Sequence, residues 1–405
     1  MSRDEFRKES RERARPSLGV LFSIVVVDLI GFGIVVPILP FWAERFGANG
    51  LTLGLLLTSH AAMQFVFAPS WGRLSDRIGR RPVMLATIAG TGFSLLALGF
   101  ADSLIGIFVA RIFSGIFGAN ISVATAYLSD VTDEEDRTRW MGMIGASFAV
   151  GFTLGPPIGG LLAKIGYGAP MLFAAGLSFV NLVWAMLRLP EPERRALHER
   201  SGLTNRLDVL RNPGIRRVCL VYFLFSVAVT QLETTFAFFM SHRFDYDVLG
   251  VAMVMFAMAV VMGGIQGGGM KRLAARFAER RLVLGGLTLM ALGFVLLPLA
   301  ESVAVLMLPL MLAAVGRGVS QPPMMGLASL QAESGDHGMV MGVFQSSASA
   351  ARVVGPVIAG ALYDLGQGLP FWLAAGLVST AAAIALGLRD PAARGPGANV
   401  PPVSL

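Results

Sequence analysis

The chain has few charged residues and almost no cysteine. Of its 405 residues, 15% are Asp, Glu, Lys or Arg, whereas 54% are hydrophobic. Ordinary soluble domains carry about 25% charged residues, so this composition excludes an ordinary soluble protein of this length. The single cysteine, Cys219, excludes an internal disulfide framework and a cysteine-based metal site. The four histidines are scattered without metal-ligand spacing: His60, His198, His242 and His337.

Long apolar runs fill the chain between charged or turn-rich gaps. Each is long enough to cross a bilayer, which takes about 20 residues of helix. The first run continues into Pro37 and Pro40 without a small-residue cleavage site, which favours a retained helix over a signal peptide. Twelve transmembrane helices are predicted: 18–41, 51–71, 83–101, 104–128, 139–163, 169–188, 216–240, 248–270, 282–300, 303–330, 340–362 and 369–388.

The stretch 141–177 returns without a gap as 341–377. Parallel internal repeats are typical of transporters whose substrate site lies between two halves of the molecule. We therefore predict an all-α membrane protein with twelve transmembrane helices in two six-helix, pseudo-symmetric halves. The predicted parts are an N-terminal tail (1–17), a six-helix bundle (18–188), a central loop (189–215), a second six-helix bundle (216–388) and a C-terminal tail (389–405).

The positive charges are distributed unevenly between the two sides of the predicted membrane. Most of the 33 Lys and Arg residues fall on the side that holds both termini, and only Arg45, Lys164 and Arg243 fall on the other. The positive-inside rule then predicts that both termini, the central loop and both tails are cytoplasmic. The excess of positive charge follows this topology, so the pI near 10.1 does not indicate nucleic acid binding.

The predicted inner loop between the second and third helices, residues 72–82, reads GRLSDRIGRRP. Short inner loops are often rich in Arg and Gly, but the whole pattern resembles the loop signature of the major facilitator superfamily. That resemblance implies a latch between the two halves on the cytoplasmic side, with Asp76 carrying most of the role. The equivalent loop of the second half has Ala275 in its place. The implied gating residues are Gly72, Asp76, Arg77, Gly79, Arg80 and Arg81.

The fifth predicted helix carries the sequence GFTLGPPIGG. Its glycines four residues apart share one face and let another backbone approach closely, while proline bends the helix. Taken alone, this spacing predicts only a tight helix contact. The pattern also resembles the antiporter signature of drug/proton exporters in the superfamily, which implies exchange rather than uptake. The residues of this motif are Gly151, Gly155, Pro156, Gly159 and Gly160.

Two acidic residues lie well inside predicted helices. The sequence from Asp28 to Pro40 resembles the first helix of tetracycline/proton and multidrug exporters of the superfamily. A charged Asp at mid-membrane costs about 2.5 to 3.5 kcal/mol, so Asp28 should face a wet cavity or be neutral. Glu233 is the leading proton or substrate residue of the second half. For both residues, a structural hydrogen-bonding role between helices is the alternative.

Arginine also occurs inside the predicted helices. Arg111, in ARIFSGIFGA, resembles the helix-four motif of the superfamily, which implies a part in proton coupling. An arginine bound to backbone carbonyls at a helix contact is the alternative. Arg352 stands where the first copy of the repeat has Phe152. Further polar residues that could line a cavity are Gln231, Gln266, Arg317 and Arg352.

The resemblance covers nearly the whole chain, but it departs from the tetracycline exporters at three polar positions. Their membrane histidine and two membrane acids fall at or near Met262, Ser94 and Met290. A different cargo is therefore expected.

The expected function is alternating-access efflux of lipophilic or amphiphilic small molecules. A proton gradient is the expected energy source, with no cofactor or metal, and the expected form is a monomer in a bacterial-type inner membrane. The alternatives are a proton-coupled metabolite importer and a membrane sensor or scaffold without flux. No catalytic constellation or phosphate-binding loop indicates an enzyme or an ATP-driven pump.

Overall fold

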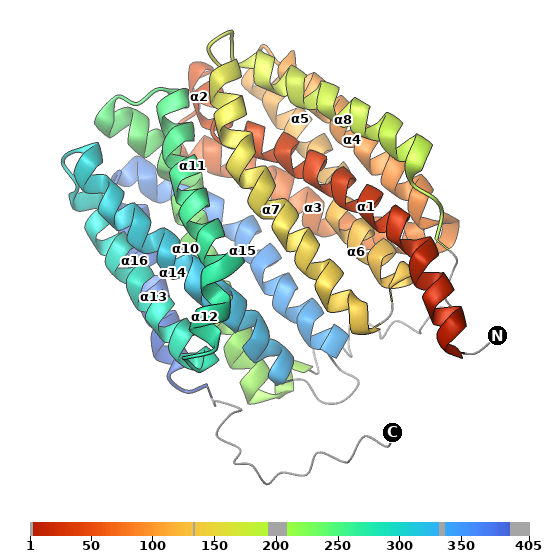
Figure 1. Cartoon of the computed structure of the whole chain (residues 1–405). Helices are drawn as coiled ribbons and strands as arrows, with labels where there is room; N and C mark the ends of the chain where they lie inside the picture. The colour runs from red at the N-terminus through yellow and green to blue at the C-terminus, as the bar shows by residue number, and fades with distance from the viewer. Residues whose placement is uncertain (1–2, 133, 193–208, 332–336, 389–405) are drawn as a thin grey trace. The chain divides into compact units, whose positions relative to one another are not determined.

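The computed structural model describes residues 3–132, 134–192, 209–331 and 337–388, and all secondary structure in these ranges is helical (Figure 1). In chain order the elements are α1 (Arg3–Val35), α2 (Leu39–Arg45), α3 (Gly50–Ile78), α4 (Arg80–Gly99), α5 (Leu104–Phe117), α6 (Asn120–Val131), α7 (Glu134–Leu162), α8 (Gly168–Arg188), η1 (Val209–Arg211), α10 (Pro213–Phe244), α11 (Val248–Gly264), η2 (Ile265–Gly269), α12 (Met270–Ala274), α13 (Glu279–Leu296), η3 (Leu297–Leu299), α14 (Val303–Leu330), α15 (His337–Leu365) and α16 (Leu369–Ala385).

Within the described ranges, ten helical segments are long and apolar enough to cross a membrane. They match the first ten predicted spans. The predicted spans 340–362 and 369–388 coincide with α15 and α16, which are not among the ten; α16 is apolar but has only 17 residues. The coarser prediction, an all-helical multi-pass protein, is therefore confirmed.

Several predicted helices have different boundaries in the structure. α1 begins at Arg3, inside the predicted tail 1–17, and ends before Pro37, where a short connection leads to α2. Proline causes this end because it lacks a backbone N–H and cannot continue the hydrogen-bond ladder. The predicted fourth helix is divided at Gly118 and Ala119 into α5 and α6. Most of the predicted central loop and the tail 389–405 lie outside the described residues.

The chain forms two compact units that interleave along the sequence. Unit 1 comprises residues 1–200, 230–260 and 352–370, and unit 2 comprises residues 201–229, 261–351 and 371–405. Parts of α10, α11 and α15 therefore cluster with the first six predicted helices, and the units do not coincide with the predicted six-helix bundles. The division into units differs from the division into predicted bundles because these parts of α10, α11 and α15 pack on helices of the first bundle. The close backbone contacts are described below.

In unit 1, α1 packs on α7 and α8, while α4 packs on α5 and α8. α1 and α7 approach at backbone distance because glycines face one another. A Cβ added at Gly155 would lie 2.5 Å from the carbonyl carbon of Gly33, and one added at Gly151 would lie 2.7 Å from that of Leu29. Such contacts are possible only without side chains.

In unit 2, α13 packs along α14, again at glycine. A Cβ added at Gly293 would lie 2.7 Å from the backbone oxygen of Pro309, and one at Gly286 would lie 2.7 Å from that of Gly316. Small residues thus set the helix spacing in each unit, as expected where lipid supplies no hydrophobic drive for helix association.

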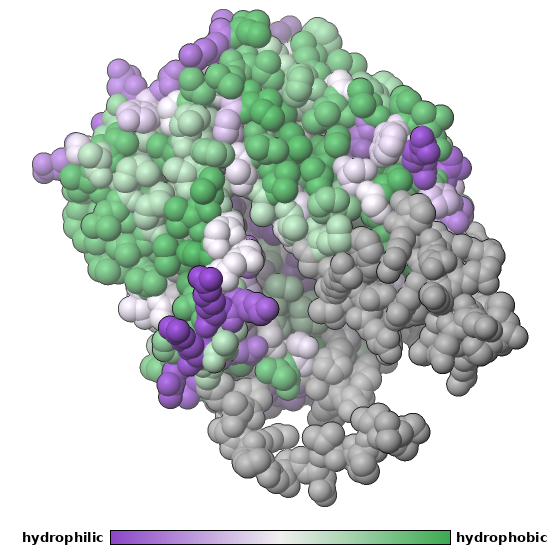
Figure 2. Space-filling view, viewed as in Figure 1, coloured by the Kyte–Doolittle hydropathy of each residue, from purple (hydrophilic) through white to green (hydrophobic). Residues whose placement is uncertain are grey.

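Apolar side chains cover much of the surface that Figure 2 shows. Large hydrophobic residues are more than 70% exposed at Phe100, Ile105, Ile165, Leu187 and Leu365. Soluble monomers rarely leave large contiguous apolar patches, whereas lipid-facing helices require them.

Candidate substrate and proton site

Asp28 lies on α1 within unit 1, half-buried, and accepts a hydrogen bond from Asn120. The Asn120 Nδ2 atom lies 2.9 Å from the Asp28 Oδ1 atom. Asn120 is 6% exposed and is the first residue of α6, directly after the division of the predicted fourth helix. The break in this helix therefore supplies the polar partner of a membrane carboxyl.

Side chains of α3 hold this break in place. Gln64 donates through Nε2 to the backbone oxygen of Gly118 at 2.5 Å, and Trp71 donates through Nε1 to that of Ile116 at 2.6 Å. These carbonyls lie at the end of α5, where the last turn of a helix lacks internal partners. The two bonds make the irregular backbone tolerable at membrane depth.

Arg111 is buried on α5, with 5% of its surface exposed, and its Nε atom has no hydrogen-bond partner. One polar neighbour from another helix is His60 of α3, which is 8% exposed and hydrogen-bonded to the Arg111 backbone. The two helices come close at this level because Gly115 meets the backbone of His60. Arg111 and His60 therefore form one buried polar pair.

Arg352 lies on the part of α15 that belongs to unit 1, where its side chain is exposed. The Thr58 hydroxyl of α3 donates to the backbone oxygen of Val353 at 2.8 Å, which fixes α15 beside α3. Arg352, the neighbour of Val353, is consequently held near the part of α3 that carries His60.

Glu233 lies on α10, also in unit 1, and its side chain is exposed. Its neighbour Gln231 is fully buried and donates through Nε2 to the backbone oxygen of Gly355 at 3.2 Å. Gln231 thus joins α10 to α15. Asp28 and Glu233 occupy the same compact unit, but the bonded partner of Asp28 is Asn120.

Gln266 and Arg317 belong to unit 2, whereas Gln231 and Arg352 belong to unit 1. Gln266 lies on η2, a π-helical turn with the sequence IQGGG. π-Helical turns inside longer helices are rare and occur often at functional sites. η2 contacts α14, where a Cβ added at Gly318, next to Arg317, would lie 3.4 Å from Ile265.

The antiporter-like motif lies on α7 and packs on two helices. Gly151, Gly155 and Gly159 face α1, and Pro156 lies inside the helix. Gly160 faces α11, where an added Cβ would lie 2.9 Å from the Cβ of Ala252. The motif therefore joins α1 to the part of α11 that belongs to unit 1.

Most of the predicted gating loop is helical. Gly72, Asp76 and Arg77 lie on the last turns of α3, so the predicted loop 72–82 starts too early and Gly72 is helical. Only Gly79 breaks the helix, with φ +113°, a backbone conformation that favours glycine. α4 starts at the next residue, Arg80.

Arg80 connects the α3–α4 corner to α6. Its guanidinium lies 2.6 Å from Asp76 and 2.6 Å from Asp130 of α6. Glu191, after α8, accepts from the backbone N–H groups of Arg80 and Arg81 at 2.6 and 2.9 Å, which caps the N-terminus of α4. These contacts all lie within unit 1. The latch between halves stays a prediction.

At the other end of unit 1, α2 meets α10 and α15. The Glu44 carboxylate lies 2.5 Å from Nε2 of His242, whose Nδ1 lies 3.0 Å from the Tyr363 hydroxyl. Asp364 accepts from the backbone N–H groups of Gly50 and Leu51 at 2.7 and 2.8 Å, capping α3. Polar bonds therefore hold segments of both predicted bundles together at this end.

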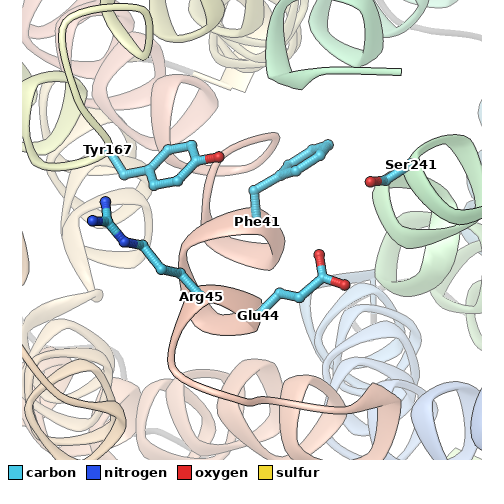
Figure 3. Close-up of a pocket in the computed structure, with 5 residues that line it drawn as sticks. All are labelled: Phe41, Glu44, Arg45, Tyr167 and Ser241. Carbon is cyan, nitrogen blue, oxygen red and sulfur yellow. The ribbon is translucent and has the colours of Figure 1, made fainter. Parts of the chain in front are cut away.

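A shallow depression of about 480 Å³ adjoins these contacts (Figure 3). Glu44 and Arg45 project into it from α2, with Tyr167 on one side and Ser241 of α10 on the other. The lining residues are Phe41, Glu44, Arg45, Tyr167 and Ser241.

The sequence analysis missed several residues that the structure joins to the predicted ones. His60 and His242 were set aside because no metal-ligand spacing contained them, yet each makes polar contacts across helices. Asn120 follows Gly115 and Gly118 inside the fourth predicted helix, but glycine by itself does not predict a break there. Asp364 carried a signal, since its repeat counterpart is Lys164.

Comparison with known proteins agrees with the helical architecture. The Major Facilitator Superfamily model matches residues 21–273 and 269–403. The class C tetracycline resistance protein of Escherichia coli is 31% identical, covering 87% of this chain and 90% of that protein. Multidrug resistance protein 1 of Bacillus subtilis is 26% identical, covering 94% and 98%.

Solved structures include the human organic anion transporter MFSD10, which is 26% identical with a TM-score of 0.71. The match covers 92% of this chain and 99% of that one. Because the family model spans well over half of the sequence, the chain belongs to the Major Facilitator Superfamily and is a membrane transporter rather than an enzyme.

Proposed function

We propose that this transporter is a proton-driven exporter of lipophilic or amphiphilic small molecules. It works by alternating access as a monomer in a bacterial-type inner membrane, with twelve helices in two halves and both termini cytoplasmic. The observation that carries the proposal is the Asp28–Asn120 pair, an ionisable carboxyl held at membrane depth by the broken fourth helix. Intramembrane acids are costly and are functional by default.

Other residues take supporting roles in this proposal. Glu233 is the second proton or substrate carboxyl, Arg111 couples proton and substrate movement, and Asp76 closes the cytoplasmic side. The glycine contact between α1 and α7 supports exchange, because it joins the helix of Asp28 tightly to the antiporter-like motif. The names of the bacterial relatives support efflux, since they describe resistance proteins.

The cargo is proposed to differ from tetracycline. Two positions that correspond to polar groups of the tetracycline exporters are used here for helix packing. The Ser94 hydroxyl donates to the Gly90 carbonyl of its own helix at 2.7 Å. Met290 is 1% exposed, and its sulfur contacts the Ser320 hydroxyl.

The test measures dye accumulation in cells that express the wild type, Asp28→Asn or Glu233→Gln, with and without a collapsed proton gradient. We expect the wild type to lower accumulation only while the gradient persists, and Asp28→Asn to abolish this difference. Asp102→Asn and Glu301→Gln, which remove exposed acids next to helix starts, serve as matched controls and should export normally.

Equal accumulation in all these cells and in empty-vector cells, over a broad panel of compounds, would contradict export. Gradient-dependent entry of a compound would favour the rival proton-coupled importer. Normal expression without flux of any compound would favour a membrane sensor or scaffold.

A further inference from the structure

The buried polar pair of unit 1 contains a cation without a counter-charge. No Asp or Glu oxygen among the described residues lies within 4.0 Å of the Arg111 guanidinium. The Nε of Arg111 and the Nδ1 of His60 are both buried without a hydrogen-bond partner. Uncompensated buried charge is expensive, particularly at membrane depth.

A second cation lies beside the pair. The Thr58–Val353 hydrogen bond holds α15 against α3 two residues before His60, and Arg352 is the residue next to Val353. Cationic side chains of α5 and α15 therefore lie on the part of α3 that carries the imidazole. Like charges repel, so the cluster is stable only if an anion or water screens it.

The wall next to this cluster is aromatic. The Phe32 ring lies 6.2 Å from the His60 ring and 5.9 Å from the Phe152 ring, measured between centroids. Phe32 is 39% exposed, so part of its face is available for contact. The site thus combines a cationic end with an apolar surface, which matches an amphiphile that carries one anionic group.

We propose that Arg111, His60 and Arg352 bind the carboxylate of an amphiphilic anion, whose apolar body packs on Phe32 and Phe152. Arginine suits this role because its planar fork binds carboxylates through paired hydrogen bonds. The proposal rests on the proposed export function, since it defines the cargo class of that function. It also gives Arg352, the departure from the repeat, a role in substrate binding.

The test measures binding of dansylaminoundecanoic acid, a fluorescent carboxylate, and of its neutral primary amide. The full-length protein is placed in nanodiscs of phosphatidylcholine, which carries no net charge. The wild type should bind the carboxylate at least about tenfold more tightly than the amide, as charge-assisted hydrogen bonds allow. Arg352→Gln and Arg111→Gln should each reduce this ratio to about one to three.

Arg352 is the decisive position because its side chain is exposed, so its replacement leaves helix packing intact. Arg352→Glu should reverse the selectivity toward a trimethylammonium analogue of the probe. Arg188→Gln, which removes an exposed charge at the end of α8, is the matched control and should keep the wild-type ratio. Equal binding of carboxylate and amide by the wild type, or an unchanged ratio in Arg352→Gln and Arg352→Glu, overturns the proposal.

Two further arms separate the possible explanations. If discs that contain phosphatidylglycerol lose carboxylate binding, a lipid phosphate occupies the site and the substrate assignment falls; unchanged binding supports it. Proton-driven export of neutral dyes without any carboxylate preference would refute the anion site alone. A carboxylate preference without export of any probe would refute the proposed function alone.

Discussion

α7 and α15 contain the first part of the two copies of the internal repeat, and they use the same glycines against different partners. On α7, Gly155 faces the backbone of Gly33 in α1. On α15, the matching Gly355 faces the side chain of Thr230 in α10, and Gly360 faces the backbone of Gly50 in α3. The shared residues therefore keep a helix close to a neighbour, but they do not decide which neighbour it is.

The positions that differ between the copies make the polar contacts. Phe152 packs on Phe32 in the first copy, whereas Arg352 approaches His60 in the second. Lys164 is exposed, whereas Asp364 caps α3. The two copies therefore share the glycines that pack helices together, and the polar contacts of α15 come from residues that differ between the copies.

Exchanging Phe152 and Arg352 between the two copies should have the largest effect on stability. Phe152→Arg places a charge among aromatic rings on α7, so we expect the free energy of unfolding to fall by about 3 kcal/mol, the cost of an arginine inside a membrane helix. Arg352→Phe should leave stability nearly unchanged while removing the carboxylate preference. Denaturant unfolding in micelles measures both variants, and equal losses would show that the two copies are interchangeable at this position.

Filling the glycine contact of α7 should have the next largest effect. A Cβ at Gly155 would lie 2.5 Å and 2.6 Å from backbone atoms of Gly33, which cannot rotate away. We expect Gly155→Ala to cost about 2 kcal/mol, within the range for overpacking. Gly355→Ala should cost less, because the nearest atom is the Thr230 hydroxyl, which can rotate away, although the Thr230 Cβ at 2.8 Å cannot.

The matched controls for this prediction are Gly176→Ala and Gly376→Ala, which have open space around an added Cβ in both copies. Alanine favours helix over glycine, so these variants should be slightly more stable than the wild type. A larger loss for Gly355→Ala than for Gly155→Ala would contradict the different roles of the two glycines.

The cap that Asp364 provides should have the smallest effect. Asp364→Asn weakens two hydrogen bonds to the first turn of α3 and removes a charge favoured by the helix dipole, at a cost of about 1 kcal/mol. Hydrogen exchange of the Gly50 and Leu51 amides should accelerate in this variant. Lys164→Gln, the change at the matching position after α7, should leave that exchange rate unchanged. Acceleration in both variants would show that the cap of α3 does not depend on Asp364.

Much of the fold was predictable because lipid restricts what can cross a membrane. The ten confirmed spans followed from apolar length alone, since a spanning segment must satisfy its backbone internally. The break between α5 and α6 was not predicted, because Gly118 is tolerated inside a helix and only the bonds from Gln64 and Trp71 make the irregular turn stable. Helix ends at Arg3 and Leu365 also lay beyond the apolar runs.

The candidate site was predictable residue by residue but not as an arrangement. Asp28, Arg111 and Glu233 stood out because charges are rare in apolar runs. Their partners did not stand out, since Asn120 and His60 are ordinary residues until helices pack. The assignment of Gln266 and Arg317 to one compact unit and of Gln231 and Arg352 to the other likewise had no signal in the sequence.

By itself, the sequence determined the membrane environment, the helical segments, the repeat and the family, because each depends on composition or on local spacing along the chain. Only the tertiary structure decided that Asn120 bonds Asp28, that His60 joins Arg111 and that Arg352 comes to the same place. These contacts join residues up to about three hundred positions apart. Hydropathy and periodicity specify which face of a helix is buried, whereas the shapes of packed glycine surfaces specify which helix it meets.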